Sequence, residues 1–194
     1  MAELLPEEPE ALGLLALMLY AEARRSARRD AQGEYVPLAQ QDPALWNETM
    51  IKEAEALLLR ARALGSIGRY QVEGALQSAH IYRCRTGHNN WPAVVELYDT
   101  LLALTASPVV AINRALAVAE IHGASAALSE LSKVAADVRL AEYQPYWATR
   151  AELLAKTGAR NEARDAYELA IGLERDASVR RFLQRRQSAL ASPI

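Results

Sequence analysis

Three glycines recur along the chain at nearly equal intervals. Gly87, Gly123 and Gly158 are separated by 36 and 35 residues, and an apolar stretch with helical spacing lies on either side of each. A fixed period of this length, with a small residue at the turn between two helices, is typical of stacked helix pairs. Because one such pair cannot bury its apolar face alone, the spacing predicts an array of pairs that share one core and offer a concave surface to a partner.

The last repeat shows the pattern most clearly. Its two helices are expected on either side of Gly158, with small, apolar and aromatic residues where a tetratricopeptide (TPR) unit packs its helices closely. These residues are Trp147, Ala151, Leu154, Ala163, Tyr167 and Ala170. Alanine and leucine dominate the chain, phenylalanine occurs once, and no alternating Val/Ile/Thr run stands out. The predicted fold class is therefore all-α, a TPR-like helical-hairpin solenoid.

Two further repeats precede the last one. The first is expected as helices over residues 70–85 and 91–104. The middle repeat begins at Pro108, a favourable residue in a first helical turn, and turns at Gly123. After the last repeat, a helix over about 176–191 has apolar residues along one side and is predicted to cap the open end of the solenoid.

The N-terminal part departs from the repeat pattern. A first helix is expected over about 7–29, and a second begins at Asp42-Pro43, an N-cap followed by a first-turn proline. From Leu12 to Tyr20 the first helix is apolar on nearly every side, which is more than one hairpin partner can cover. We therefore expect it to pack on other domains or, in a homodimer, on a second copy. The predicted division is an atypical hairpin in residues 1–68 and repeats with the capping helix in 69–194, as one continuous domain.

Charge and composition exclude several classes of protein. The chain has 22 Lys and Arg against 24 Asp and Glu, a net charge of −2, so it has no general attraction to nucleic acid. The arginines of the first and last helices lack interleaved aromatic residues, and we expect no direct DNA or RNA contact. A single cysteine fits a reducing compartment. No segment resembles a signal peptide, and the apolar run 11–21 is about half of the roughly 20 residues that span a bilayer. A cytoplasmic location without membrane contact is expected.

The candidate for metal or catalytic chemistry is the spacing of His80, Cys84 and His88. The first two share a helix face, as metal ligands or a nucleophile and its base can do. His88, however, lies beyond the turn at Gly87, no fourth ligand is near, and no helix N-terminus is at hand to activate the thiol. We therefore predict no metal, no cofactor and no enzymatic activity. His80 is expected to pack against the neighbouring repeat through a hydrogen bond.

The candidate binding site is a groove on the concave side of the predicted solenoid, which the first helix of each pair lines. Asn113 offers a donor and an acceptor there, and Arg114 offers a bidentate fork. With their expected neighbours, the predicted partner-binding residues are Gln77, His80, Asn113, Arg114, Glu120 and Arg150. The alternative is that Arg114 and Arg150 form structural ion pairs with carboxylates such as Glu120 or Asp99, and the two roles are compatible.

Several segments also match a known sequence pattern. A leucine-rich segment runs from Leu4 to Leu19, and the more specific Leu97-Tyr98-Asp99 is followed by the run from Ser107 to Ala115. Further matches are Gln41-Asp42, Leu45-Trp46, Tyr70-Gln71, Trp91 and Arg180-Arg181-Phe182-Leu183. Together these segments, which span nearly the whole chain, resemble the C-terminal TPR-containing extension of a group of bacterial extracytoplasmic-function RNA polymerase sigma factors.

The resemblance implies an accessory domain that follows two sigma regions. Those regions bind polymerase and read promoters, and they are expected before Leu4, where this sequence has only Met1-Ala2-Glu3. We therefore expect an excised domain or a shortened relative. No residue of this sequence is expected to take part in promoter recognition. The implied function is regulatory: binding the sigma regions of the parent polypeptide, RNA polymerase or a signalling protein, and so tuning transcription initiation. The alternative is a stand-alone TPR adaptor unrelated to transcription.

Overall fold

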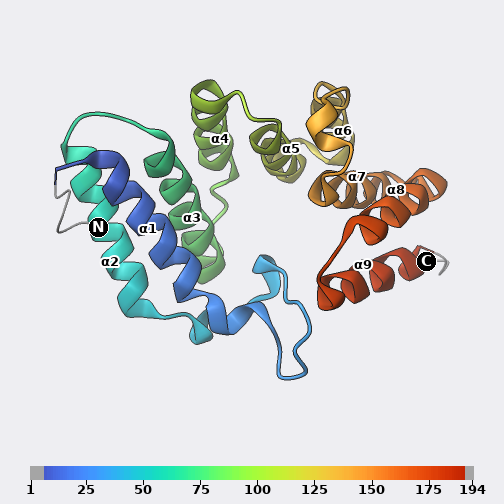
Figure 1. Cartoon of the computed structure of the whole chain (residues 1–194), viewed down its shortest axis with the longest axis horizontal. Coiled ribbons are helices and arrows are strands. Elements are labelled where there is room, and N and C mark those ends of the chain that lie inside the picture. Colours follow the sequence, from blue (N-terminus) through green and yellow to red (C-terminus); the bar gives the residue numbers. More distant parts are fainter. Residues whose placement is uncertain (1–6, 191–194) are drawn as a thin grey trace. The chain divides into compact units, whose positions relative to one another are not determined.

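The computed structural model describes residues 7–190, in which helices are joined by turns and irregular connections. This part of the chain contains nine α-helices, four short 3-10 helices and no β-strand, which confirms the all-α fold class (Figure 1). The α-helices are α1 (Pro9–Ala23), α2 (Glu48–Ala63), α3 (Arg69–Thr86), α4 (Trp91–Thr105), α5 (Pro108–His122), α6 (Ala124–Ser132), α7 (Gln144–Thr157), α8 (Arg160–Leu173) and α9 (Ala177–Ala189). Within this part, no helix is long and apolar enough to cross a membrane. The start of the leucine-rich segment, Leu4-Leu5-Pro6, lies outside the described residues.

The helices form two units. Unit 1 takes in the described residues up to Gln32 together with Val36–Ala106, and unit 2 takes in Gly33–Tyr35 together with the described residues from Ser107 onward. The expected division after residue 68 differs from this grouping, because α3 packs on α1 as well as on α4. The helix pair that turns at Gly87 therefore shares a unit with the N-terminal helices.

Helix α1 lies at the centre of unit 1. Leu12 and Tyr20 are completely buried, because α2 packs on one side of α1 and α3 packs on another. The sequence suggested only one hairpin partner for this apolar helix, whereas the structure gives it two. Leu15 and Leu19 remain half-buried and Met18 is exposed, so packing of α1 on a second copy or another domain stays a prediction.

Both helices of the N-terminal hairpin are shorter than the sequence predicts. Helix α1 ends at Ala23, and a separate 3-10 helix follows it. Asp42 caps only the 3-10 helix Pro43–Leu45. Helix α2 begins later, at Glu48, because the side chain of Asn47 accepts a hydrogen bond from a backbone N–H of its first turn. Asn47 is therefore the residue in the sequence that marks the start of α2.

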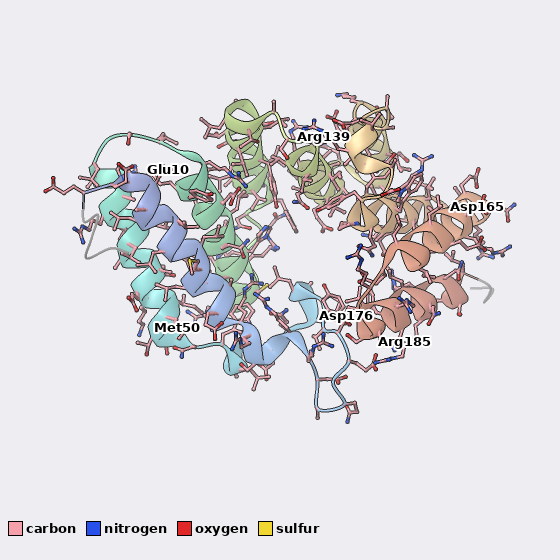
Figure 2. All side chains as sticks on the ribbon, viewed as in Figure 1. Glu10, Met50, Arg139, Asp165, Asp176 and Arg185 are labelled. Carbon is pink, nitrogen blue, oxygen red and sulfur yellow. The ribbon has the colours of Figure 1, made fainter. Side chains whose placement is uncertain are left out.

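Two glycines allow α1 and α3 to approach closely. A Cβ atom at Gly13 would lie 2.6 Å from the backbone nitrogen of Gln71. At the start of α3, Gly68 leaves room for the carboxylate of Glu10, which accepts hydrogen bonds from the N–H groups of Tyr70 (3.0 Å) and Gln71 (3.3 Å). Glu10, labelled in Figure 2, therefore caps α3 from α1, since Gly68 has no side chain with which to do so.

Unit 2 is built from consecutive helices that pack on one another. Helix α5 packs on α6, α7 packs on α8, and α9 packs on α8. Gly123 and Gly158 end α5 and α7 with φ of 83° and 82°, and in unit 1 Gly87 ends α3 with φ of 70°, as expected for the three glycine turns. Residues of the last repeat form one buried cluster with Leu183 of α9: Ala151, Leu154, Ala163, Ala166, Tyr167 and Ala170.

Candidate functional site

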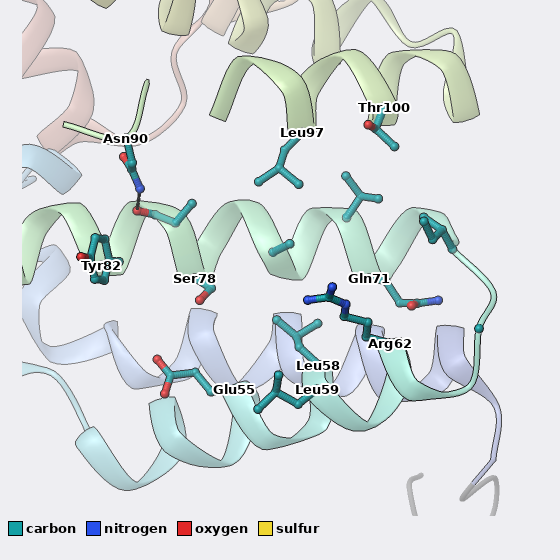
Figure 3. A pocket seen from close by; sticks show the side chains of 15 residues that line it. Glu55, Leu58, Leu59, Arg62, Gln71, Ser78, Tyr82, Asn90, Leu97 and Thr100 are labelled. Carbon is teal, nitrogen blue, oxygen red and sulfur yellow. Dashed lines mark hydrogen bonds between the residues drawn. The ribbon is translucent and has the colours of Figure 1, made fainter. Parts of the chain in front are cut away.

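A groove of about 990 Å³ opens in unit 1 between α2, α3 and α4 (Figure 3). Helix α3 contributes the small residues Ala75, Ser78 and Ala79, while Leu58 of α2 and Leu97 of α4 extend from the two flanking helices. Because protein interiors are otherwise closely packed, small side chains between two flanking helices leave a hollow that larger ones would fill. The sequence of α3 thus creates the groove.

Apolar side chains are unusually exposed along this groove. Leu59 is 68% exposed, Ile67 is 72% exposed and Tyr82 is 50% exposed, and all three line it. Single exposed apolar residues are ordinary on a protein surface, but a group of them around one hollow is typical of an interaction site.

The run Leu57-Leu58-Leu59 on α2 explains part of this exposure. Successive residues on a helix point about 100° apart, so three consecutive leucines cannot all face one core. Leu57 and Leu58 pack against the core of unit 1, and Leu59 is left outside it. This triple-leucine run is the sequence signal that could have located the groove.

The groove also carries one charge of each sign, both supplied by α2. Glu55 and Arg62 line it, and neither forms an ion pair with another described residue. Gln71 lies toward the same end as Arg62 (Figure 3) and is only 9% exposed. Among residues 7–190 its amide nitrogen, Nε2, has no hydrogen-bond acceptor. Because an unsatisfied buried donor costs about 1–3 kcal/mol, this end of the groove is suited to a partner that brings an acceptor.

A polar cluster joins α3 to the start of α4. The guanidinium of Arg83 lies over the ring of Trp91, 3.7 Å from its centroid, and donates to Oδ1 of Asn90 at 3.4 Å. Its Nη2 is 3.0 Å from Nδ1 of His80. Burial, and then the positive charges of Arg83 and Arg24, lower the pKa of His80 to about 4. At neutral pH the imidazole is therefore uncharged, and Nδ1 can accept the hydrogen bond from Arg83.

Two of the six predicted groove residues, Gln77 and His80, lie in unit 1, and neither lines the groove described above. Gln77 accepts a 2.6 Å hydrogen bond from Nη2 of Arg24, which ties α3 to the end of α1. His80 bonds to Arg83 of its own helix, and not to a neighbouring repeat as expected, while its ring meets the edge of Trp91. A role of either residue in partner binding stays a prediction.

The other four predicted residues lie in unit 2. Arg114 forms an ion pair with Glu130 of α6, with Nη1 and Oε2 3.0 Å apart, so the structural role that the sequence left open for this arginine is present. Asn113 and Glu120 are exposed, and Arg150 is half-buried. Their role in binding also stays a prediction.

His80, Cys84 and His88 are engaged in separate contacts. Cys84 is half-buried against the core of unit 1, and the ring of His88 lies beside that of Tyr82 with centroids 6.0 Å apart. In the described part of the chain, no three His, Cys, Asp or Glu side chains gather as metal ligands would. The expected absence of a metal and a cofactor is not tested by this arrangement and stays a prediction.

Comparison with known proteins gives relatives whose function is not described. Residues 1–62 match a family of unknown function, DUF6596. The chain is 38% identical over 189 residues to an uncharacterized protein of Rhizobium meliloti (strain 1021). That alignment covers 97% of this chain but 44% of the relative, so the chain spans less than half the length of the protein it matches. No solved structure shows significant similarity to the chain.

Proposed function

We propose that this chain is a regulatory protein-interaction domain of an extracytoplasmic-function sigma factor, with the groove of unit 1 as its partner-binding surface. The observation that carries the proposal is that groove, with its exposed Leu59 and Ile67 and the unpartnered amide of Gln71. The partner is the sigma regions of a longer polypeptide, RNA polymerase or a signalling protein, and its binding tunes transcription initiation. This role belongs in the cytoplasm.

The form of the groove favours a protein partner over a small molecule. Its volume of about 990 Å³ is at the upper end of small-molecule sites, which usually enclose most of their ligand. Here the apolar side chains Leu59, Ile67 and Tyr82 are each at least half exposed, so a small ligand would leave them in water. A partner helix would cover them, as amphipathic helices do in other hydrophobic grooves.

We also propose the finer fold, a TPR-like solenoid of three helix pairs: α3 with α4, α5 with α6, and α7 with α8. The spacing of the glycine turns supports it. Helix α9 is proposed as the cap, because Leu183 and the neighbouring Val179 and Phe182 cover apolar side chains of the last pair. Helices α1 and α2 form the atypical hairpin.

Two observations support a link to transcription. Segments across nearly the whole chain, of which Leu97-Tyr98-Asp99 is among the more specific, resemble the extension of sigma factors. The Rhizobium meliloti relative is more than twice as long as the region it shares with this chain, which leaves room for further domains. That these further domains are sigma regions is part of the proposal.

A chimera tests the proposed function. The full-length relative, a form without the region that matches this chain, and a chimera in which this chain replaces that region are each added to core RNA polymerase. Promoter-specific transcripts are then read from a library of genomic fragments. We expect the full-length relative and the chimera to start transcription at defined sites, and the truncated form to do so at a changed level.

One variant in the groove and one control variant outside it complete the experiment. Leu59→Asp places a charge at the edge of the groove and is expected to reproduce the truncated form. Leu169→Asp makes the same change at an exposed leucine of α8 outside the groove and is expected to resemble the unmodified chimera. A full-length relative that adds no promoter-specific transcript to core polymerase overturns the link to transcription and leaves the adaptor role.

A further inference from the structure

Helix α2 presents a surface that is complementary to itself. Glu55 and Arg62 line the groove seven residues apart, which is about 10 Å along a helix axis. Leu58 and Leu59 lie midway between them. When a second α2 runs in the opposite direction, its arginine stands where the first helix has glutamate, and its leucines meet the leucines of the first.

We propose that two copies of this chain dimerise through the groove when no other partner occupies it. Helix α2 of each copy lies antiparallel to α2 of the other, over the small residues of the other copy's α3. The dimer has two-fold symmetry, so every contact is made twice. This inference does not rest on the link to transcription; it rests on the groove, for which the second copy competes with the proposed partner.

The proposed register gives Glu55, Arg62 and Gln71 each a partner on the second copy. Glu55 of the second copy reaches the end at which Arg62 and Gln71 lie (Figure 3). Its carboxylate can accept hydrogen bonds from the guanidinium and, once the side chain of Gln71 turns toward the groove, from the unpartnered Nε2. The exposed side chain of Leu59 is covered near the two-fold axis. The buried donor, the two charges and the apolar edge are thus satisfied by one occupant.

Other modes of recognition fit the groove less well. Addition of a strand needs an exposed sheet edge, and residues 7–190 contain no β-strand. Polyproline segments bind grooves lined with aromatic side chains, and Tyr82 is the one aromatic residue among the lining side chains of this groove. The remaining kind of occupant is a helix. Helix α2 of a second copy carries Glu55 and Arg62 at the spacing that pairs with Arg62 and Glu55 of the groove.

Charge reversal tests the register directly. Sedimentation velocity of the full chain is measured over a wide concentration range for the wild type, Glu55→Arg and Arg62→Glu. Each single variant turns two attractive pairs into two repulsive ones, and we expect dimerisation to weaken about tenfold or more. The double variant restores both pairs and is expected to dimerise like the wild type. Glu53→Arg, an exposed change on α2 outside the groove, is the matched control and is expected to have no effect.

A mixture of the two single variants is the sharpest measurement. In a heterodimer of Glu55→Arg with Arg62→Glu, both pairs are again attractive, so the mixture is expected to dimerise although each variant alone does so poorly. Thermal melting confirms that each variant folds. A wild type that stays monomeric at every concentration overturns the proposal, as do single variants that dimerise like the wild type or a mixture that shows no recovery.

Discussion

Substitution of Gly13 by alanine tests the close crossing of α1 and α3. Glycine inside a helix is less favourable than alanine by about 0.5–1 kcal/mol, so helix propensity alone predicts that Gly13→Ala stabilises the protein. The structure predicts the opposite. A Cβ at this position would lie 2.6 Å from the backbone nitrogen of Gln71 and 2.8 Å from the carbonyl carbon of Tyr70, well inside the 3.4 Å at which ordinary contacts begin.

The size of the effect follows from which atoms must move. Backbone atoms of α3 cannot rotate away, so the two helices must separate by several tenths of an ångström. Overpacking of this kind costs about 1–3 kcal/mol, and the movement also lengthens the hydrogen bonds from Tyr70 and Gln71 to Glu10. After the gain in helix propensity is subtracted, we expect a net loss of about 1 kcal/mol, or roughly 2–4 °C in melting temperature for a chain of this length.

Two other glycine-to-alanine variants serve as controls. At Gly74 the nearest atom to the new Cβ, at 2.9 Å, is the methyl end of Leu58, which can move, so the expected change is near zero. At Gly172 in α8 nothing lies within 4 Å, so a small gain is expected. Thermal melting followed by circular dichroism ranks the three variants. A Gly13→Ala protein that melts at or above the wild-type temperature would refute the account of this crossing.

Three more predictions concern stability. His80 has a pKa of about 4 in the fold against 6.5 when unfolded, so between pH 6.5 and pH 4 the unfolded chain binds more protons. The free energy of unfolding should therefore fall by on the order of 3 kcal/mol as the pH drops through this window. Urea unfolding at a series of pH values should show a weaker dependence of stability on pH for His80→Asn than for the wild type. Gly68→Ala places a Cβ 2.2 Å from Cδ of Glu10 and should lower stability by about 1–2 kcal/mol, because it displaces the carboxylate that caps α3. In a double-mutant cycle, this loss of stability should largely vanish when Glu10 is already replaced by alanine. Trp147→Ala should cost about 3 kcal/mol of stability, because it removes a ring packed against both buried clusters of unit 2. Arg114→Ala should cost about 1 kcal/mol, because its ion pair is partly exposed. Equal losses of melting temperature in the two variants would mean that Arg114 is structural and that its assignment to a binding groove is wrong.

Local features of the fold could be predicted where one residue type has one physical role. The glycines at positions 87, 123 and 158 marked helix ends because positive φ is available to glycine at little cost. The close approach at Gly13 could not be predicted, because it depends on which helix crosses α1. The long-range cap from Glu10 was hidden for the same reason: sequence rules place a cap next to the helix it serves, and here the cap is 60 residues from the N–H group it serves.

The candidate site was harder to predict than the helices. From the sequence, a groove is expected on the first helices of the repeats, where Asn113 offers a donor and an acceptor to a partner. The groove in unit 1 instead arises from an absence of bulk, at Ala75 and Ala79, next to the exposed Leu59. Small residues on a helix normally indicate close packing, and only the positions of α2 and α4 show that here they leave a hollow.

Folding of unit 1 and occupation of its groove are linked, because whatever binds the folded unit stabilises it by mass action. If a second copy is the occupant, the melting temperature of the wild type rises with protein concentration. Arg62→Glu should remove that rise and leave the melting temperature of the dilute protein near the wild-type value, since Arg62 is exposed. Gly13→Ala should instead lower the melting temperature at every concentration, because Gly13 lies against the backbone of Gln71, at the end of α3 where the core of unit 1 meets the groove. The concentration dependence of melting therefore separates a perturbation of the groove alone from one that also reaches the core.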